Sequence, residues 1–152
     1  MKKFLYFSII ILLVASCNKE QRYSGKLMKG ETWKLTGVYV DGAYYGFGGN
    51  WTITSDVNIY DSIPSAVWSG NKQTARFEWQ FHDKGKSFVI SYNDPTCINC
   101  PTPPEDLDFH CYFLSGKYDV TRHKKNQMKF VSTQTVGFPG QTVHIDIEKI
   151  QK

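Results

Sequence analysis

Three cysteines in the second half of the chain have a spacing that could do chemistry. Cys97 and Cys100 form a C-x-x-C motif, and Cys111 follows them. Such a pair can be a thioredoxin-type redox couple, half of a zinc site or a disulfide. A redox pair lowers its thiol pKa at a helix N-terminus, but the proline-rich run that begins at Pro101 cannot open a normal amphipathic helix. Haem attachment would need a histidine at that position.

A zinc site and a disulfide are the alternatives that remain for these thiols. Zinc needs four ligands, and Cys111 with His110 or His82 would complete the set only if the loop folded back over the following strand. Outside the cytoplasm a disulfide is the default. We therefore predict a structural disulfide among Cys97, Cys100 and Cys111, which allow three pairings and leave one thiol over. A bond from Cys97 or Cys100 to Cys111 would staple the loop onto the following strand. A metal site, free thiols and a buried thiol at Cys111 are the alternatives, and we expect neither a metal nor a cofactor.

Histidines and glycines elsewhere in the chain show no catalytic pattern. His82, His110, His123 and His144 stand far apart, and each falls on an expected polar face or turn, so we expect solvated side chains. We find no Ser-His-Asp unit and no close pair of carboxylates as a unit. The glycine-rich run 46–49 does not follow a strand and open a helix, as a phosphate-binding loop should. The sequence therefore predicts a protein that is not an enzyme.

The N-terminus predicts export. Lys2 and Lys3 precede an apolar run over 4–14, which is too short to cross a bilayer and is typical of a signal peptide. Val14-Ala15-Ser16-Cys17 resembles the lipobox of bacterial lipoproteins, in which cleavage before the cysteine leaves its amine and thiol carrying fatty acyl chains such as palmitate. An ordinary signal peptide with an incidental cysteine is the alternative. The resemblance implies a signal peptide over 1–16 and a membrane anchor at Cys17.

The same resemblance, to lipoproteins of Gram-negative bacteria, implies a location. Asn18 in place of an aspartate after the lipidated cysteine permits sorting to the outer membrane, and we expect the periplasmic face. Lys19-Glu20 is an echo of the tract that exports lipoproteins of Bacteroidetes to the cell surface, which is the alternative. Basic and acidic residues alternate over the mature chain, whose precursor has a net charge of +4, so we expect no binding to nucleic acid.

The clearest secondary structure is a hairpin over 76–93. Apolar residues alternate with polar ones on both sides of a turn at Gly85, which can adopt the positive φ of a short turn. The apolar residues of the hairpin are Phe77, Trp79, Phe81, Phe88, Ile90 and Tyr92. Such a hairpin is stable only when further strands cover its apolar face.

Other segments repeat the period of two. The first predicted strand, 32–40, places Trp33, Leu35 and Tyr39 on one face with Gly37, where a bulge or bend is expected. Residues 43–73 predict a long connection with an extra strand or helical turn, and 94–106 a proline-rich surface loop. Further strands are expected at 51–54, 107–113, 118–121, 128–130 and 142–149. The sequence thus predicts an all-β domain over 31–152, an antiparallel up-and-down barrel of about eight strands, with a closed sandwich as the alternative.

A family resemblance rests on Gly30-Glu31-Thr32-Trp33-Lys34-Leu35-Thr36. This segment resembles the opening of lipocalin-like lipoproteins of Bacteroidetes, small barrels that begin with a glycine and a tryptophan after a lipidated tether, here 17–30. The hairpin with Trp79 and the last strand fit the same layout, over 27–150. Lipocalins proper separate the glycine and tryptophan by one residue, and this chain separates them by two. The resemblance implies the barrel fold and a small apolar ligand, and Trp33 is expected to plug the barrel floor.

Two functions remain open at this stage. The first is a membrane-tethered protein that binds a small apolar ligand, either in the barrel interior or at the rim formed by the loops at 43–50 and 94–106. For the lining residues, simple core packing is the alternative role. The candidate lining residues are Trp79, Phe81, Phe88, Ile90, Phe109 and Phe113. The second is an interaction module that presents Tyr44, Tyr45, Phe47 and the proline-rich loop at 94–106 to an envelope protein. Ser62, in Asp61-Ser62-Ile63, resembles an O-glycosylation acceptor of Bacteroidetes.

Overall fold

The computed structural model of the protein describes residues 19–29, 32–45, 49–53, 63–70, 72–92 and 107–150. The strands are β1 (Thr32–Val40), β2 (Ala43–Tyr44), β3 (Gly49–Ile53), β4 (Ser65–Gly70), β5 (Gln73–His82), β6 (Ser87–Ser91), β7 (Gly116–His123), β8 (Gln127–Gln134) and β9 (Pro139–Lys149). Residues 19–29 form an N-terminal helix, Asp83–Gly85 a 3-10 turn and Leu107–Phe113 helix α2.

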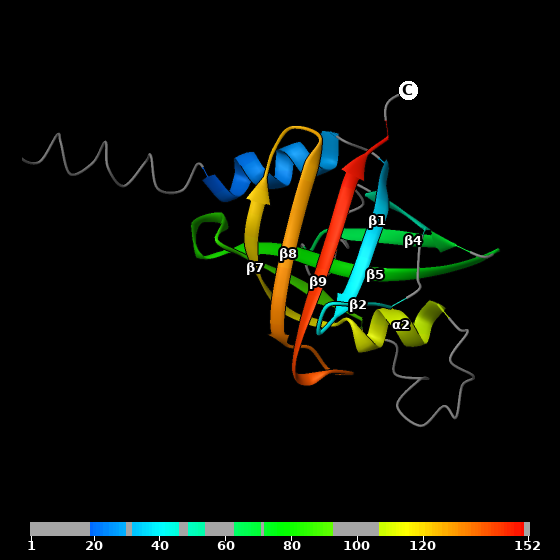
Figure 1. Cartoon of the computed structure of the whole chain (residues 1–152). Helices are drawn as coiled ribbons and strands as arrows, with labels where there is room; N and C mark the ends of the chain where they lie inside the picture. The colour runs from blue at the N-terminus through cyan, green and yellow to red at the C-terminus, as the bar shows by residue number, and fades with distance from the viewer. Residues whose placement is uncertain are drawn as a thin grey trace, which may run out of the picture.

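Eight of the strands form one closed barrel. Each strand pairs antiparallel with its neighbour in the order β1-β3-β4-β5-β6-β7-β8-β9, and β9 pairs with β1 to complete the circle. The short strand β2 extends this sheet by pairing with the end of β1. The predicted up-and-down barrel is confirmed, and the two-layered sandwich is not formed because a single sheet closes on itself. Figure 1 shows the N-terminal helix at one end of the barrel and α2 at the other.

The predicted central hairpin is β5–β6. Phe77, Trp79 and Phe81 point into the barrel and are buried, while the residues between them face outward. Its turn contains three successive left-handed residues, with φ of 54° at Asp83, 60° at Lys84 and 77° at Gly85. Gly85 is expected at such a turn, since only glycine adopts positive φ without steric cost.

Strand β1 contains the predicted bulge, and the bulge changes which residues face inward. The pairing with β9 slips by one residue between Leu35 and Gly37, so Val38 is fully buried and Tyr39 is turned to the outside. The prediction that Tyr39 shares the face of Trp33 is therefore wrong. A Cβ on Gly37 would lie 2.4 Å from the Tyr39 ring, so this glycine is needed for the ring to cross the strand.

The barrel interior is filled by large side chains in contact with one another. The ring centroids of Phe88 and Phe130 lie 4.5 Å apart, and those of Trp51 and Phe77 lie 5.0 Å apart. Each buried aromatic side chain removes roughly 150–250 Å² from water, so these rings dominate the driving force for folding. The largest fully buried side chains are Trp33, Trp51, Trp68, Trp79, Tyr118, Phe88, Phe130, Leu27, Leu114, Met128, Ile145 and Ile147.

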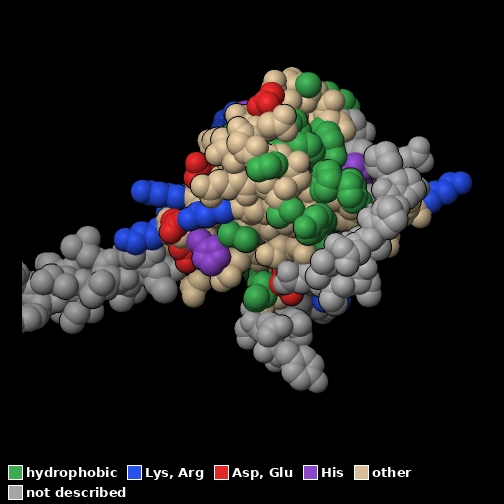
Figure 2. All heavy atoms as spheres, turned by 90° about the horizontal axis from the view of Figure 1, so that it is seen from below, with side chains coloured by type: hydrophobic (Ala, Val, Ile, Leu, Met, Phe, Trp, Pro, Cys, Tyr) green, Lys and Arg blue, Asp and Glu red, His purple; other side chains and the backbone are tan. Residues whose placement is uncertain are grey.

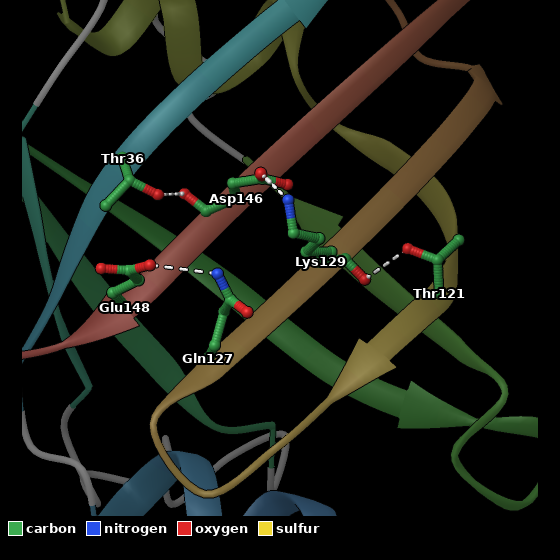
Figure 3. A network of polar contacts seen from close by, with 6 residues as sticks. All are labelled: Thr36, Thr121, Gln127, Lys129, Asp146 and Glu148. Carbon is green, nitrogen blue, oxygen red and sulfur yellow. Dashed lines mark hydrogen bonds and ion pairs between the residues drawn. The ribbon is translucent and has the colours of Figure 1, made fainter.

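Polar pairs cross the outer face of β1, β9, β8 and β7 (Figure 3). The Lys129 ammonium pairs with the Asp146 carboxylate, and the Asp146 carbonyl accepts a hydrogen bond from Thr36 Oγ1 at 3.1 Å. Gln127 Nε2 donates to Glu148 Oε1 at 3.0 Å. Such cross-strand pairs favour one register, and they leave the outside of this wall polar.

Residues 107–113 form α2, and the strand predicted there is wrong. Both periods fit the segment, because Leu107, His110 and Cys111 are also spaced for one face of a helix, and these three are its buried residues. The sheet offers this segment no position, since β6 pairs directly with β7. The extra strand expected within 43–73 exists as β4, which separates β3 from β5.

The segment expected to be a tether is helical over 19–29 and packs on the barrel. Leu27 is fully buried, and its carbonyl accepts a hydrogen bond from Trp33 Nε1 at 2.9 Å. The Tyr23 ring stacks on His123 with centroids 3.5 Å apart, and a Cβ on Gly85 would lie 2.7 Å from that ring. Helices this short are marginal alone, so packing on two hairpin turns holds this one.

Truncation of Leu27 tests whether this helix is part of the fold. Leu27→Ala removes a fully buried side chain, and we expect a loss of about 2–5 kcal/mol in the free energy of unfolding. Met28→Ala, one residue along and exposed, is the matched control and should change it by less than about 0.5 kcal/mol. Urea unfolding of both variants measures this, and equal effects would mean that the helix does not pack on the barrel.

The position of His123 predicts a loss of stability in acid. Burial, together with the nearby positive charges of Lys26 and Arg22, lowers the pKa of His123 to about 4. In the unfolded chain the imidazole takes up its proton near pH 6.5. The unfolded state therefore binds more protons between these values, and stability falls as pH decreases from about 6.5 to about 4.

Replacing His123 isolates this effect. We expect the urea midpoint of His123→Gln to fall less between pH 7 and pH 4 than that of the natural chain. His82→Gln, on an exposed side chain, is the matched control and should keep the natural pH dependence. The same slope in all three proteins would contradict the assignment.

Candidate functional site

Four of the predicted lining residues lie together inside the barrel. Trp79, Phe81, Phe88 and Ile90 are each at most 3% exposed. The rings of Trp79 and Phe88 stack with centroids 6.0 Å apart, and Phe81 and Phe88 lie 4.9 Å apart. Trp79 Nε1 donates to the Ser65 carbonyl at 3.1 Å. These side chains pack on one another, so a ligand between them would have to separate rings that are in contact.

Trp33 and Trp51 differ in how their indole N–H groups are satisfied. Trp33 is fully buried where the N-terminal helix covers the barrel, as expected of a plug, and its N–H donates to Leu27. Trp51 is 1% exposed, and its Nε1 has no acceptor among the described residues. A buried indole N–H usually has a partner, so Trp51, like the buried Thr135 hydroxyl, has unused hydrogen-bonding capacity among the described residues.

Described residues line two hollows on the outside of the barrel wall. A groove of about 280 Å³ runs between β7 and β8, where Lys117 pairs with Asp83 at 2.8 Å and Ser132 Oγ donates to the Lys117 carbonyl at 2.6 Å. Lys117 and Ser132 thus bond within the protein. A second hollow of about 60 Å³ beside Trp79 has room for little more than water. Neither is the apolar pocket of several hundred Å³ that a small-molecule site needs.

Apolar side chains gather instead at the end of the barrel that carries α2. Seen from that end, Figure 2 shows them as a broad group on the surface. We call this surface the aromatic end. It contains three exposed residues, Tyr44 (58%), Tyr112 (40%) and Val136 (48%), and four half-buried rings. Those rings are Tyr45, Phe109, Phe113 and Phe138.

Ring contacts hold the aromatic end together. Phe138, from the turn before β9, lies edge-on to Tyr45 at 5.0 Å and to Phe113 at 5.8 Å. Phe109 and Phe113 of α2 have centroids 3.9 Å apart. Gly137 donates its N–H to the Phe113 carbonyl at 2.9 Å, and its missing Cβ would lie 2.3 Å from the Phe113 ring. Three separate segments therefore form one preorganised surface.

A buried histidine joins α2 to Tyr45, the residue that follows β2. Tyr45 Oη and His110 Nδ1 lie 3.0 Å apart in a hydrogen bond, and the two rings meet edge to face at 5.4 Å. Burial raises the pKa of Tyr45, so its hydroxyl keeps its proton at neutral pH. The prediction that His110 is solvated is wrong, because the helix turns it inward. His82 is exposed as predicted, while His123 and His144 are half-buried.

The predicted cysteine and modification sites fall largely outside the described residues. Cys17, Ser62, Cys97 and Cys100 all lie there. Cys111 is buried and free, and burial, with a smaller effect of the Asp108 carboxylate, raises the pKa of its thiol. It therefore adopts the alternative of a buried thiol. Within the described part of the chain, no three His, Cys, Asp or Glu side chains converge on a possible metal site.

Alkylation without reductant tests the thiols. In the folded soluble chain that starts after Cys17, Cys111 should not react at pH 8, because it is buried and protonated. After denaturation we expect one label, located on Cys111 by peptide mapping, if Cys97 and Cys100 form the disulfide. Three labels would remove the disulfide prediction, and a label on Cys111 in the folded chain would contradict its burial.

Sequence reasoning placed part of this surface correctly. Tyr44 and Tyr45 were predicted to be presented at the rim, and Phe47 lies outside the described residues. Tyr112 and Phe138 were missed. A signal existed for Phe138, because an aromatic residue within a Gly-Phe-Pro-Gly turn stands where polar residues are usual. Phe109 and Phe113, predicted as interior, lie on this surface.

Comparisons with known proteins add little to the geometry. No protein-family model and no curated protein matches the chain. Among solved structures it is similar to japanin from Rhipicephalus appendiculatus bound to cholesterol, at 9% identity and a TM-score of 0.44, over 80% of this chain and 76% of that one. So distant a likeness transfers no ligand. The lipocalin-like architecture follows from the closed eight-stranded topology itself.

Proposed function

We propose that this protein is a lipid-anchored, non-catalytic binding module of the bacterial envelope whose aromatic end docks a partner protein. The observation that carries the proposal is the exposure of Tyr44, Tyr112 and Val136 beside rings locked by their own contacts. Scattered exposed apolar residues are ordinary, but a contiguous patch marks an interaction surface. Rigid aromatic side chains are the residues that most often dominate binding energy at such surfaces.

The packing of the interior supports binding outside the barrel. Trp79, Phe81 and Phe88 fill the space that a lipocalin-like protein would use for a ligand. Opening that space would cost the contacts of several buried rings, each worth several kcal/mol to the fold. Docking at the aromatic end needs no such change, because its rings already stand at the surface.

The chemistry of the surface indicates the partner. Tyrosine hydroxyls lie among the rings of this end. Three segments form it, 41–45, 107–113 and 136–138, and their acidic residues are Asp41 and Asp108. The same segments contain no lysine or arginine. A matching surface is therefore apolar, with hydrogen-bonding groups opposite Tyr44 and Tyr112. The expected lipid at Cys17 precedes the N-terminal helix, and this helix lies at the end of the barrel opposite the aromatic end. This arrangement supports an orientation in which the aromatic end points away from the membrane.

Site-specific photocrosslinking in intact cells tests the docking. A photoreactive phenylalanine derivative in place of Tyr112 should give one protein adduct of discrete mass, and the same group in place of Gln80, exposed on the barrel wall, is the matched control. The purified partner should then bind about 30-fold more weakly to Tyr44→Ser/Tyr112→Ser, a loss of about 2 kcal/mol. Adducts of equal yield at both positions, or none, would refute the proposal.

Trp51 favours a second candidate function, the binding of a small apolar molecule. Its buried indole N–H has no acceptor among the described residues, and a ligand with one carbonyl or hydroxyl oxygen would supply it. Native mass spectrometry of the purified chain tests this candidate. A small molecule that co-purifies with the natural chain and is lost in Trp51→Phe would establish it, while an apo monomer in both would exclude a ligand retained at this position.

A further inference from the structure

We propose that the opposite end of the barrel, covered by the N-terminal helix, docks on an anionic lipid bilayer. The surface consists of the basic side chains of residues 19–29 and of the hairpin turns next to them. This inference concerns the end remote from the aromatic end and does not depend on the partner proposed there. The proposal uses the lipid that the sequence predicts at Cys17, but the experiment that tests it works on a protein without that lipid.

Four basic residues follow one side of the helix. Lys19, Arg22, Lys26 and Lys29 are all exposed, and at 3.6 residues per turn they fall within an arc of about 80°. The centre of this arc stands about 120° from the buried Leu27, so the basic side faces away from the barrel. Within the described residues no carboxylate forms an ion pair with any of the four, so their charges are available to a partner.

Neighbouring turns add charge to the same end. The Tyr23–His123 stack brings the β7–β8 turn, with exposed Lys124 and Lys125, against the helix. Lys149 Nζ donates to the Lys29 carbonyl at 3.4 Å, which places the end of β9 there as well. Residues far apart in the sequence are thus collected at one end of the barrel.

The β5–β6 turn contributes on the other flank of the helix. The backbone N–H of Lys84 donates to the Glu20 carboxylate, so exposed Lys84 and Lys86 also lie beside the helix. The carboxylates here are fewer than the basic side chains: Glu20 accepts that bond, Asp83 pairs with Lys117 at 2.8 Å, and Glu148 accepts a bond from Gln127. The end as a whole therefore carries an excess of positive charge.

Position and charge together indicate a bilayer as the occupant. The helix begins at residue 19, two positions after the expected lipid at Cys17, so acyl chains would hold this end within reach of the headgroups. The acyl chains fix the position of this end at the membrane, and a basic patch beside them is an additional signal that strengthens and orients the attachment. Basic side chains near an anionic surface each contribute about a fivefold gain in partitioning. No helix within the described residues is long and apolar enough to cross the bilayer.

Vesicle flotation of the lipid-free mature chain, Cys17→Ser, tests the proposal. We expect binding to phosphatidylcholine vesicles that contain about 30 mol% phosphatidylglycerol, little binding to phosphatidylcholine alone, and release at about 0.5 M salt. Lys26→Gln/Lys29→Gln should lower the partition coefficient about 20-fold. Neither lysine has a side-chain contact with another described residue in a hydrogen bond or ion pair, so the variant should fold, which circular dichroism checks.

The matched control removes the same charge elsewhere. Lys72→Gln/Arg76→Gln acts on the β4–β5 hairpin, at the other end of the barrel, where neighbouring Gln73 accepts a hydrogen bond from Leu107 of α2. Because Arg76 also donates to Ser65 Oγ at 3.0 Å, circular dichroism checks the fold of this variant too. The control should change the partition coefficient by less than about twofold. Equal losses in both variants would mean that net charge alone drives adsorption and would overturn a defined docking face. Absence of binding to the anionic vesicles at low salt would overturn the proposal too, even if the chain bound a soluble polyanion.

Discussion

The pairing of β1 with β9 is the contact on which the rest of the structure depends. It joins the first and last strands of the sheet from Trp33 opposite Lys149 to Val40 opposite Val143. Closure leaves no long unpaired edge, and it encloses the aromatic faces that no single hairpin could bury. The one-residue slip at Gly37 lets β1 keep Trp33, Leu35 and Val38 inside the barrel and place Tyr39 outside. Because the chain must return to its own beginning, most of the stabilising contacts are long-range, and folding must overcome the entropy of closing the whole chain.

The closed barrel separates two chemically different ends. At one end, α2 and the turn before β9 form a surface of tyrosine and phenylalanine rings locked by Gly137 and by the His110–Tyr45 bond. At the other, Tyr23 and Leu27 fasten a helix with a basic outer side. A protein with an apolar end and a cationic end adopts a preferred orientation at an anionic surface, because its cationic end is attracted to that surface. A protein held at the membrane by its cationic end would expose its aromatic end on the side that faces away from the membrane.

A filled interior changes what this architecture can do. Eight-stranded barrels stand at the size where side chains either fill the interior or leave room for one small ligand. Here four tryptophans and the rings of β5, β6 and β8 occupy that space, so the barrel acts mainly as a rigid support for its ends. Trp51, with its unsatisfied N–H, is an interior position where the hydrogen bonding is incomplete among the described residues. Both proposed docking functions reside in surfaces that the barrel holds in place, as is common when loops and ends vary on a constant scaffold.

The sequence alone determined the strand-rich class, the β5–β6 hairpin, the turn at Gly85 and the site of the bulge at Gly37, because a period of two and the backbone freedom of glycine are local properties. It also carries the expected lipidation signal at Cys17. Only the tertiary structure decided that residues 107–113 are a helix, since both periods fit them and the direct β6–β7 pairing removes the alternative. The gathering of lysines from three separate segments around residues 19–29 was likewise beyond the sequence. Charges that alternate along a chain become a patch only when strands bring distant turns together, and no local rule encodes which turns will meet.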